Sequence, residues 1–223
     1  MIRSRVIGLS GLKGSGKDTV ANYLADEHGF RILSFADALK DVTGSLWNLP
    51  RPMLEGDSDV SRKFREEYKH PANGKTPRQL LQEVGVAMRE VDPHVWVNYV
   101  RTGIDLSMNN GRDVVVTDVR FPNEMDMIQY FGQMWRVVPA ANKIPLWYND
   151  LIETCGNMDF RQEATPGALN AYFDEHISET LLSLPTAESE MDAVIDNDSD
   201  FENLFQQIDE KLNECNERSS PMS

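Results

Sequence analysis

The apolar residues change their spacing several times within the first fifty positions. Residues 6–10 form a short apolar run typical of a buried strand. After a glycine-rich turn, apolar residues recur at helical spacing over 18–28, and Gly29 follows as a stop signal. Residues 31–35 predict a second strand and residues 36–47 a second helix. This alternation predicts an α/β fold with a central parallel sheet flanked by helices.

Further periodic segments continue the same alternation. Residues 113–118 are the clearest buried strand, because they are continuously β-branched and end in an acid. Thr76 and Pro77 predict a helix start, with a hydroxyl cap and proline at the first helical position. The other predicted elements are helices over 95–106, 123–131 and 200–212, and strands over 134–138 and 193–195.

Three segments lack this regularity. Residues 49–75 hold several prolines and glycines between charged residues, and we interpret them as an irregular excursion with one short helix over 61–68. Residues 140–190 have weak periodicity and predict a mobile lid or a loosely ordered insertion. Residues 213–223 are interpreted as a frayed tail. With no internal repeat, the whole of 1–223 is interpreted as one domain.

Charge narrows the possible partners. The 223 residues include 22 basic and 36 acidic side chains, for a formal net charge of −14. This field repels phosphate backbones and anionic lipid, so we expect neither a nucleic-acid partner nor a membrane surface. A local cleft for a small phosphate ligand remains compatible with it. Residues 62–78 reverse the local charge, which we interpret as a solvated helix face, with nucleic-acid binding as the weaker alternative.

Cysteine usage and hydropathy point to a reducing compartment. Cys155 and Cys215 have no partner motif, so we expect two free thiols rather than a disulfide scaffold or a zinc site. No apolar run approaches the roughly 18 residues of a membrane span. Residues 1–5 lead directly into the first predicted strand, and we expect no signal peptide. The sequence therefore predicts a soluble cytoplasmic protein.

The turn after the first strand carries the clearest chemistry. Gly11 is followed after four residues by Gly16 and Lys17, which matches the phosphate-loop pattern in its strand–loop–helix context. Glycines let the backbone wrap an anion, the helix start adds its positive end, and the lysine supplies a charge for the β- and γ-phosphates. The pattern expects Ser or Thr next, to hold Mg²⁺. Here Asp18 comes first and Thr19 second, so either could hold the metal.

The rest of the chain favours a small-molecule kinase among phosphate-loop proteins. A guanine-specific switch needs an Asn-Lys-x-Asp segment, and residues 142–145 lack the aspartate. A motor ATPase is usually longer, with an acidic pair after its second motif. Phosphoryl transfer needs converging cations near the transferred group. The basic candidates for that role are Lys13, Lys40, Arg78 and Arg120, besides Lys17.

Each candidate also has a plainer interpretation. Asp118 ends a predicted parallel strand, where ligands bind in α/β sheets, but it could simply cap the next segment. Arg120 could pair with Glu124 on the surface. Arg78 and Gln82 could simply lie on a solvated helix face. The plainer interpretations are core packing for Trp96 and a surface position for His176.

The sequence resembles the phage-type deoxynucleoside monophosphate kinases. The segments that carry the resemblance, in order along the chain, are 10–19, 78–85, 96–97, 115–126 and 174–179. The resemblance implies a P-loop kinase fold and transfer of a phosphoryl group from ATP, with Mg²⁺, to a deoxynucleoside 5′-monophosphate. It implies action in the host cytoplasm if a phage encodes the protein. Members are often dimers, so a homodimer is considered, although no interface signature stands out.

The resemblance also implies roles for individual residues. Those implied for ATP and its metal are Gly14, Ser15, Gly16, Lys17, Asp18 and Thr19. Those implied for the acceptor nucleotide are Lys13, Lys40, Arg78, Gln82, Trp96, Asp118, Arg120, Asn123 and Glu124, with His176 and Glu179 on the lid. The catalytic residues among them would be Lys17, Asp118 and Arg120. Two alternatives stay open: a kinase of another small metabolite, similar to dephospho-coenzyme A kinase, and a non-catalytic ATP-binding regulator.

Overall fold

In the computed structural model, the described residues are 4–144, 148, 182 and 185–218. The chain divides into two compact units. The first consists of Met1–Leu33 and Ile104–Ser223, and the second of Ser34–Gly103. Each unit contains a cluster of buried apolar side chains of its own.

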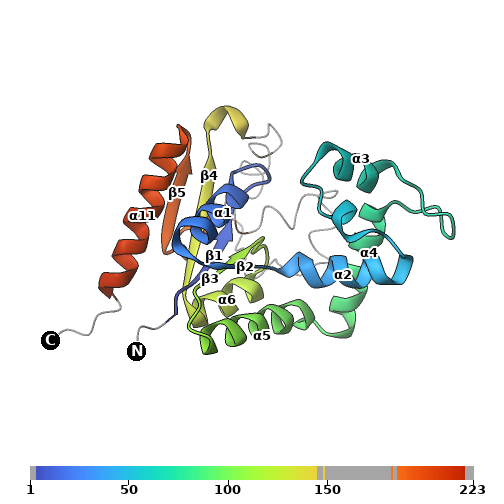
Figure 1. Ribbon diagram of the computed structural model, residues 1–223, viewed down its shortest axis with the longest axis horizontal. Helices are drawn as coiled ribbons and strands as arrows, with labels where there is room; N and C mark the ends of the chain where they lie inside the picture. The colour runs from blue at the N-terminus through green and yellow to red at the C-terminus, as the bar shows by residue number, and fades with distance from the viewer. Residues whose placement is uncertain (1–3, 145–147, 149–181, 183–184, 219–223) are drawn as a thin grey trace. The chain divides into compact units, whose positions relative to one another are not determined.

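The first unit is built on a five-stranded sheet in the order β2-β3-β1-β4-β5 (Figure 1). β1 pairs in parallel with both β3 and β4, and β4 pairs in parallel with β5. The strands are β1 (Val6–Ser10), β2 (Arg31–Ser34), β3 (Val114–Thr117), β4 (Gln133–Pro139) and β5 (Ala193–Asn197). Parallel strands bring their carboxyl ends to one edge of the sheet, which is where open α/β sheets bind ligands.

Helices cover both faces of this sheet. On one face, alternate strand residues such as Leu9 and Trp135 join a buried cluster with Leu24 of α1 (Lys17–His28) and Ile208 of α11 (Phe201–Arg218). On the other face, α6 (Pro122–Phe131) packs closely on β1 and β4. The predicted α/β fold with a parallel sheet between helices is therefore confirmed.

Close packing explains a glycine in the central strand. A Cβ atom on Gly8 would lie 2.8 Å from the side chain of Ile128 on α6 and 2.7 Å from the sulfur of Met134. Such contacts are shorter than van der Waals separation, so a larger residue would push α6 off the sheet. α6 matters for the site because its first turn holds the loop that follows β3.

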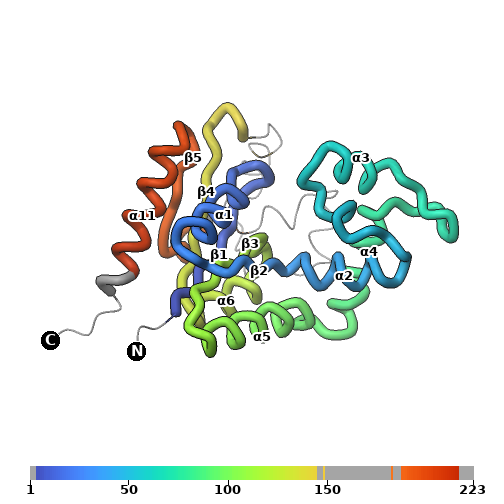
Figure 2. Tube along the Cα trace, in the orientation of Figure 1, coloured from blue at the N-terminus to red at the C-terminus, as the bar shows by residue number. Residues whose placement is uncertain are grey.

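The second unit is helical, and the trace in Figure 2 can be followed through it from α2 to the start of α5. Its helices are α2 (Phe35–Trp47), η1 (Arg51–Leu54), α3 (Asp59–Glu67), α4 (Pro77–Val91) and the first part of α5 (Val95–Asn109). Its core cluster contains Leu49, Leu54, Leu80 and Leu81. The helix start at Thr76 and Pro77 is confirmed, because the Thr76 hydroxyl accepts a hydrogen bond from the backbone N–H of Gln79.

The excursion predicted over 49–75 is more ordered than its composition suggests. It contains two helices, η1 and α3, and Leu54 of η1 is fully buried. The predicted short helix exists but begins at Asp59, two residues early, because Ser58 caps it through the backbone N–H of Ser61. The second predicted strand ends one residue early at Ser34, since the Ser34 hydroxyl caps α2.

The predicted tail is wrong over 213–218. α11 continues to Arg218, because Cys215 packs against the core of the first unit and Lys211 pairs with Glu214 on the exposed side. The amphipathic pattern therefore extends beyond the last leucine of the helix. Residues 219–223 and most of the predicted lid over 140–190 lie outside the described residues.

Two further sequence predictions concern the cysteines and membrane-spanning segments. Of the two predicted thiols, Cys215 forms no disulfide among the described residues, and Cys155 lies outside them. Within the described parts of the chain, no helix combines the length and the apolar character needed to span a membrane.

Candidate active site

The glycine-rich loop between β1 and α1 lies against the ends of β4 and β5. Gly11 has φ +141°, and a Cβ there would lie 2.3 Å from the carbonyl oxygen of Val137. Gly16 has φ +103°, and a Cβ there would lie 2.3 Å from the side-chain amide of Asn197. Both positions require glycine for conformation and for space. Gly14, by contrast, has no atom within 4 Å of its Cβ direction, so this part of the loop is open.

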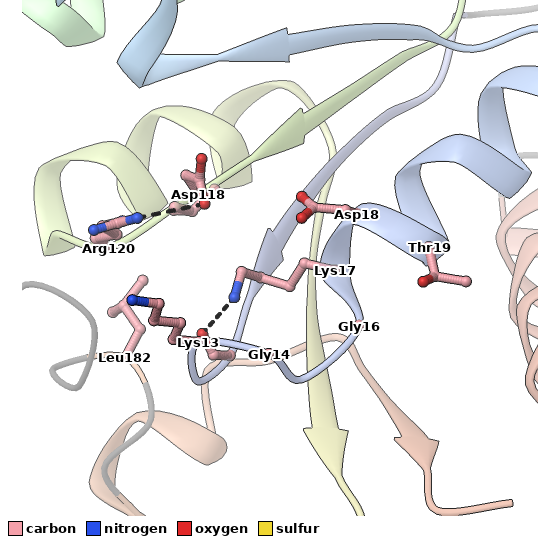
Figure 3. Close-up of a pocket in the computed structure, with 11 residues that line it drawn as sticks. Lys13, Gly14, Gly16, Lys17, Asp18, Thr19, Asp118, Arg120 and Leu182 are labelled. Carbon is pink, nitrogen blue, oxygen red and sulfur yellow. Dashed lines mark hydrogen bonds and ion pairs between the residues drawn. The ribbon is translucent and has the colours of Figure 1, made fainter. Parts of the chain in front are cut away.

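The lysine of the loop is held against its own backbone. Lys17 is the first residue of α1, and its Nζ donates hydrogen bonds of 2.8 Å to the Gly11 carbonyl and 2.9 Å to the Leu12 carbonyl. Figure 3 shows this amine pointing to the inside of the loop. The positive charge and the start of α1 therefore act on the same small volume, which is the arrangement that binds phosphate.

A cavity of about 240 Å³ lies over this loop. Its lining residues are Gly11, Lys13, Gly14, Gly16, Lys17, Asp18, Thr19, Asp118, Val119, Arg120 and Leu182 (Figure 3). All of them belong to the first unit. The structure thus brings the loop residues together with the predicted acid and arginine at the end of β3.

The turn after β3 supplies the opposite wall of the cavity. Asp118 has φ +60°, a left-handed conformation that is uncommon outside glycine and costs free energy. The backbone N–H of Val119 donates 3.1 Å to the Leu9 carbonyl, which fixes the turn against β1. Arg120 Nη2 lies 3.5 Å from Asp118 Oδ1, so the two side chains form an ion pair within the cavity wall.

The Glu124 carboxylate holds this turn through hydrogen bonds from its backbone. Its side chain is buried, and its Oε2 accepts hydrogen bonds of 2.9 Å from the backbone N–H of Arg120 and 3.2 Å from that of Phe121. The plainer interpretation of Arg120 was a surface pairing with Glu124. In the structure the Glu124 carboxylate accepts from backbone N–H groups, and the Arg120 guanidinium pairs with Asp118. Asn123, its neighbour in the first turn of α6, is half-buried.

The loop offers oxygen ligands suited to Mg²⁺. The exposed Asp18 carboxylate and the half-buried Thr19 hydroxyl both line the cavity. Among the described residues, no group of three or more His, Cys, Asp and Glu side chains gathers into a metal site. Mg²⁺ is usually held by one or two protein oxygens together with substrate phosphates and water. The residues present fit that mode of binding.

Four predicted acceptor residues belong to the second unit. Lys40 Nζ lies 2.6 Å from Glu55, and Arg78 Nε lies 2.5 Å from Glu66. Gln82 is exposed on α4, one turn from Arg78. Trp96 is 5% exposed, which agrees with its interpretation as core, and its indole N–H has no hydrogen-bond partner within the described chain. His176 and Glu179 lie outside the described residues.

Sequence reasoning missed Asn197, whose side chain touches the loop. Its Nδ2 donates a hydrogen bond of 2.8 Å to the carbonyl of Ser15. Its place at the end of a predicted strand was a usable signal, because the carboxyl ends of parallel strands share one edge.

Comparison with known proteins agrees with this geometry. No family model matches the chain. A protein of Acanthamoeba polyphaga mimivirus named "Putative deoxynucleotide monophosphate kinase" is 36% identical over 138 residues, covering 57% of this chain and 69% of the relative. A dephospho-CoA kinase of Nostoc sp. strain PCC 7120 is 25% identical over 215 residues, covering 94% and 97%. The solved structure of TT1252 from Thermus thermophilus has a TM-score of 0.50 at 15% identity, covering 95% and 97% of the two chains, and supports the fold.

The fold and the loop define the class first. A parallel sheet whose first strand leads through a lysine-bearing phosphate loop into a helix is the architecture of a P-loop kinase. Within that class, the similarity to the mimiviral protein shows that the chain belongs to the deoxynucleotide monophosphate kinase family. The resemblance found in the sequence is thereby confirmed.

Proposed function

We propose that this protein transfers the γ-phosphoryl group of ATP to a deoxynucleoside 5′-monophosphate, giving a deoxynucleoside diphosphate and ADP. The observation that carries the proposal is the cavity in which Lys17 of the phosphate loop meets Asp118 and Arg120 from the end of β3. Membership of the deoxynucleotide monophosphate kinase family supports the choice of acceptor.

The reaction needs positioning and positive charge more than a base. The acceptor phosphate is already ionised at neutral pH, so its oxygen can attack the γ-phosphorus directly. The bond from the γ-phosphorus to the β,γ-bridging oxygen breaks, and ADP leaves. Negative charge spreads over the transferring group, and Lys17 and Arg120 stabilise it. Asp118 orients the Arg120 guanidinium through the ion pair described above.

Asp18 and Thr19 are the proposed ligands of Mg²⁺, and Gly14, Ser15 and Gly16 belong to the proposed ATP-binding loop. When bound, the metal neutralises phosphate charge and orients the β- and γ-phosphates. The chain's own part is to present a carboxylate and a hydroxyl at the start of α1, beside the lysine.

In the unit that holds the cavity, the proposed acceptor contacts are Lys13, Asn123 and Glu124. Lys40, Arg78, Gln82 and Trp96, in the second unit, keep the acceptor roles that the resemblance implies. Lys40 and Arg78 each carry a carboxylate partner, so an incoming phosphate would replace Glu55 and Glu66 as their counter-ion. His176 and Glu179 are proposed to act on the lid segment.

A second acceptor is favoured by one specific observation. The similarity to the Nostoc dephospho-CoA kinase is lower in identity but runs over nearly the whole of both chains. Dephospho-CoA is therefore the alternative small-molecule acceptor.

An ADP-release assay with Mg·ATP separates the two acceptors. The panel contains each common 5′-monophosphate, in deoxy and ribo form, and dephospho-CoA. We expect turnover on one or more deoxynucleotides that exceeds turnover on dephospho-CoA by at least tenfold. Turnover on dephospho-CoA alone would replace the proposed acceptor, and silence on the whole panel with ATP still binding would leave a non-catalytic regulator.

A further inference from the structure

The side chain of Asn197, at the carboxyl end of β5, contacts the phosphate loop. Asn197 is the last residue of β5, and its Nδ2 donates 2.8 Å to the carbonyl oxygen of Ser15. The same nitrogen occupies the space that a Cβ on Gly16 would need, at 2.3 Å. One amide group therefore both binds the loop and limits which residue the loop can hold.

The pleat of β5 explains why this side chain reaches the loop. Side chains alternate between the two faces of a strand, so Asn197 points to the same face as Ala193 and Ile195. Those two residues are buried in the core cluster that includes α1. Because α1 begins directly after Gly16, the strand end on this face arrives beside the loop.

The backbone at this strand end is fixed on both sides. Towards the sheet, the carbonyl of Asn197 accepts a hydrogen bond of 3.1 Å from the backbone N–H of Ala140. Towards the sheet edge, Gln207 of α11 satisfies Asp196 twice, since its Nε2 donates 2.9 Å to the Asp196 carbonyl and its Oε1 accepts 3.0 Å from the Asp196 N–H. Hydrogen bonds on both sides therefore hold the backbone that carries the Asn197 side chain.

We propose that Asn197 is a positioning residue of the nucleotide site, which holds Ser15 and Gly16 in the conformation that binds ATP phosphates. Its donated hydrogen bond ties the Ser15 carbonyl to β5, next to the left-handed Gly16 from which α1 starts. Without this tie, the loop must be ordered by the ligand itself, and part of the binding free energy is lost. The inference rests on the nucleotide-binding half of the proposed function and on no particular acceptor.

Direct binding of Mg·ATP, measured by titration calorimetry, tests the proposal without requiring catalysis. Asn197→Leu keeps the branched shape and the number of heavy atoms of the side chain but removes the donor, and Asn197→Ala removes both the donor and most of the side chain. Loss of one hydrogen bond at the loop predicts about a tenfold rise in Kd for either variant. The matched control is Asn213→Ala, an exposed asparagine of α11, which should bind within twofold of the wild type.

A double-mutant comparison separates positioning from general damage. Gly16→Ala weakens binding in the wild type through both backbone conformation and the clash with Asn197. In the Asn197→Ala background the clash is relieved, so the second substitution should cost less than it does alone. Thermal unfolding of each variant reports whether it is folded at the temperature of the titration.

Two binding results would overturn the proposal. The first is a Kd for Mg·ATP within twofold of the wild type in both Asn197→Leu and Asn197→Ala. The second is a double variant whose rise in Kd equals the product of the rises for Gly16→Ala and Asn197→Ala measured alone. Gln207→Ala provides a second route, because it loosens the strand end without touching the loop, and a Kd between those of wild type and Asn197→Ala is expected. Absence of turnover on every acceptor would remove the proposed reaction but leave these binding results unchanged.

Discussion

The Lys17 amine supplies a positive charge inside the phosphate loop. Two loop carbonyls hold it at 2.8 and 2.9 Å, inside the loop that binds phosphate. Replacing it by alanine removes this charge and its two hydrogen bonds to the loop. We expect Lys17→Ala to lower kcat/KM about 10²–10³-fold. Steady-state kinetics beside the exposed control Lys63→Ala measures the effect, and equal activities of the two variants would contradict the role.

Asp118 combines an unfavourable backbone conformation with a place in the cavity wall. Glycine adopts φ +60° freely, so Asp118→Gly relieves the strain while it removes the partner of Arg120. We expect the free energy of unfolding to rise by about 0.5–1 kcal/mol while kcat falls. Denaturant unfolding and kinetics on the same preparation test this, and a loss of both stability and activity would show that the carboxylate holds the fold instead.

Residue patterns predicted the glycine-rich loop and, at the end of β3, Asp118 and Arg120 of the same cavity, but they missed Asn197. Gly11, Gly16 and Lys17 act within one strand–loop–helix unit, so short-range spacing was enough to find them. Asn197 lies 182 positions from Ser15, and only the strand order of the sheet brings the two together. The contacts of the Glu124 side chain could not be predicted from the sequence either. A glutamate four residues after Arg120 can accept hydrogen bonds from the backbone of the turn or pair with the Arg120 side chain, and the spacing is the same in both cases.

The first turn of α6 holds the loop after β3, which carries Asp118 and Arg120. The buried Glu124 carboxylate accepts two backbone hydrogen bonds there. Removing it leaves the Arg120 and Phe121 N–H groups without that acceptor, so Glu124→Ala should lower the free energy of unfolding by about 1–3 kcal/mol. Urea unfolding measures the change against Glu90→Ala, an exposed glutamate of α4 that should be nearly neutral. Equal stabilities of the two variants would contradict the capping role.

The start of α3 gives a pH-dependent signal in the second unit. The Ser61 hydroxyl donates 3.0 Å to Asp57, and this hydrogen bond lowers the pKa of Asp57 below its ordinary value. A lowered folded-state pKa contributes stability above the unfolded pKa, and that contribution is lost as the pH falls through the folded value. NMR titration should show the pKa of Asp57 rising in Ser61→Ala, and an unchanged pKa would remove the hydrogen bond as its cause.

At the level of elements, the sequence predicted which segments are helices and strands better than where they end. Helix ends depend on single caps such as Ser34 and Ser58, and on packing such as that of Cys215, which extends α11. The excursion over 49–75 forms helices because Leu54 finds a core in its own unit. A hydrophobic partner distant in sequence gives no local signal, so composition alone favoured irregular structure.

Over the whole molecule acidic side chains outnumber basic ones, but three basic side chains gather at one cavity. The chain carries a formal charge of −14, yet Lys13, Lys17 and Arg120 line one small cavity. Arg120 pairs with Asp118 in that cavity, and basic residues over 62–78 of the second unit also have acidic partners. These partners include Asp59 for Arg62, Glu67 for Lys63, Glu83 for Lys75 and Glu66 for Arg78.

Transfer of the γ-phosphate label from ATP to a deoxynucleotide is the decisive measurement for the proposed reaction. The protein is incubated with Mg·ATP labelled at the γ-phosphate and with a deoxynucleoside 5′-monophosphate, and the products are separated after a single quench. Phosphoryl transfer predicts label in the deoxynucleoside diphosphate, with ADP formed in equal amount and little label in inorganic phosphate. Label found only in inorganic phosphate, or in no product while ATP remains bound, would contradict it.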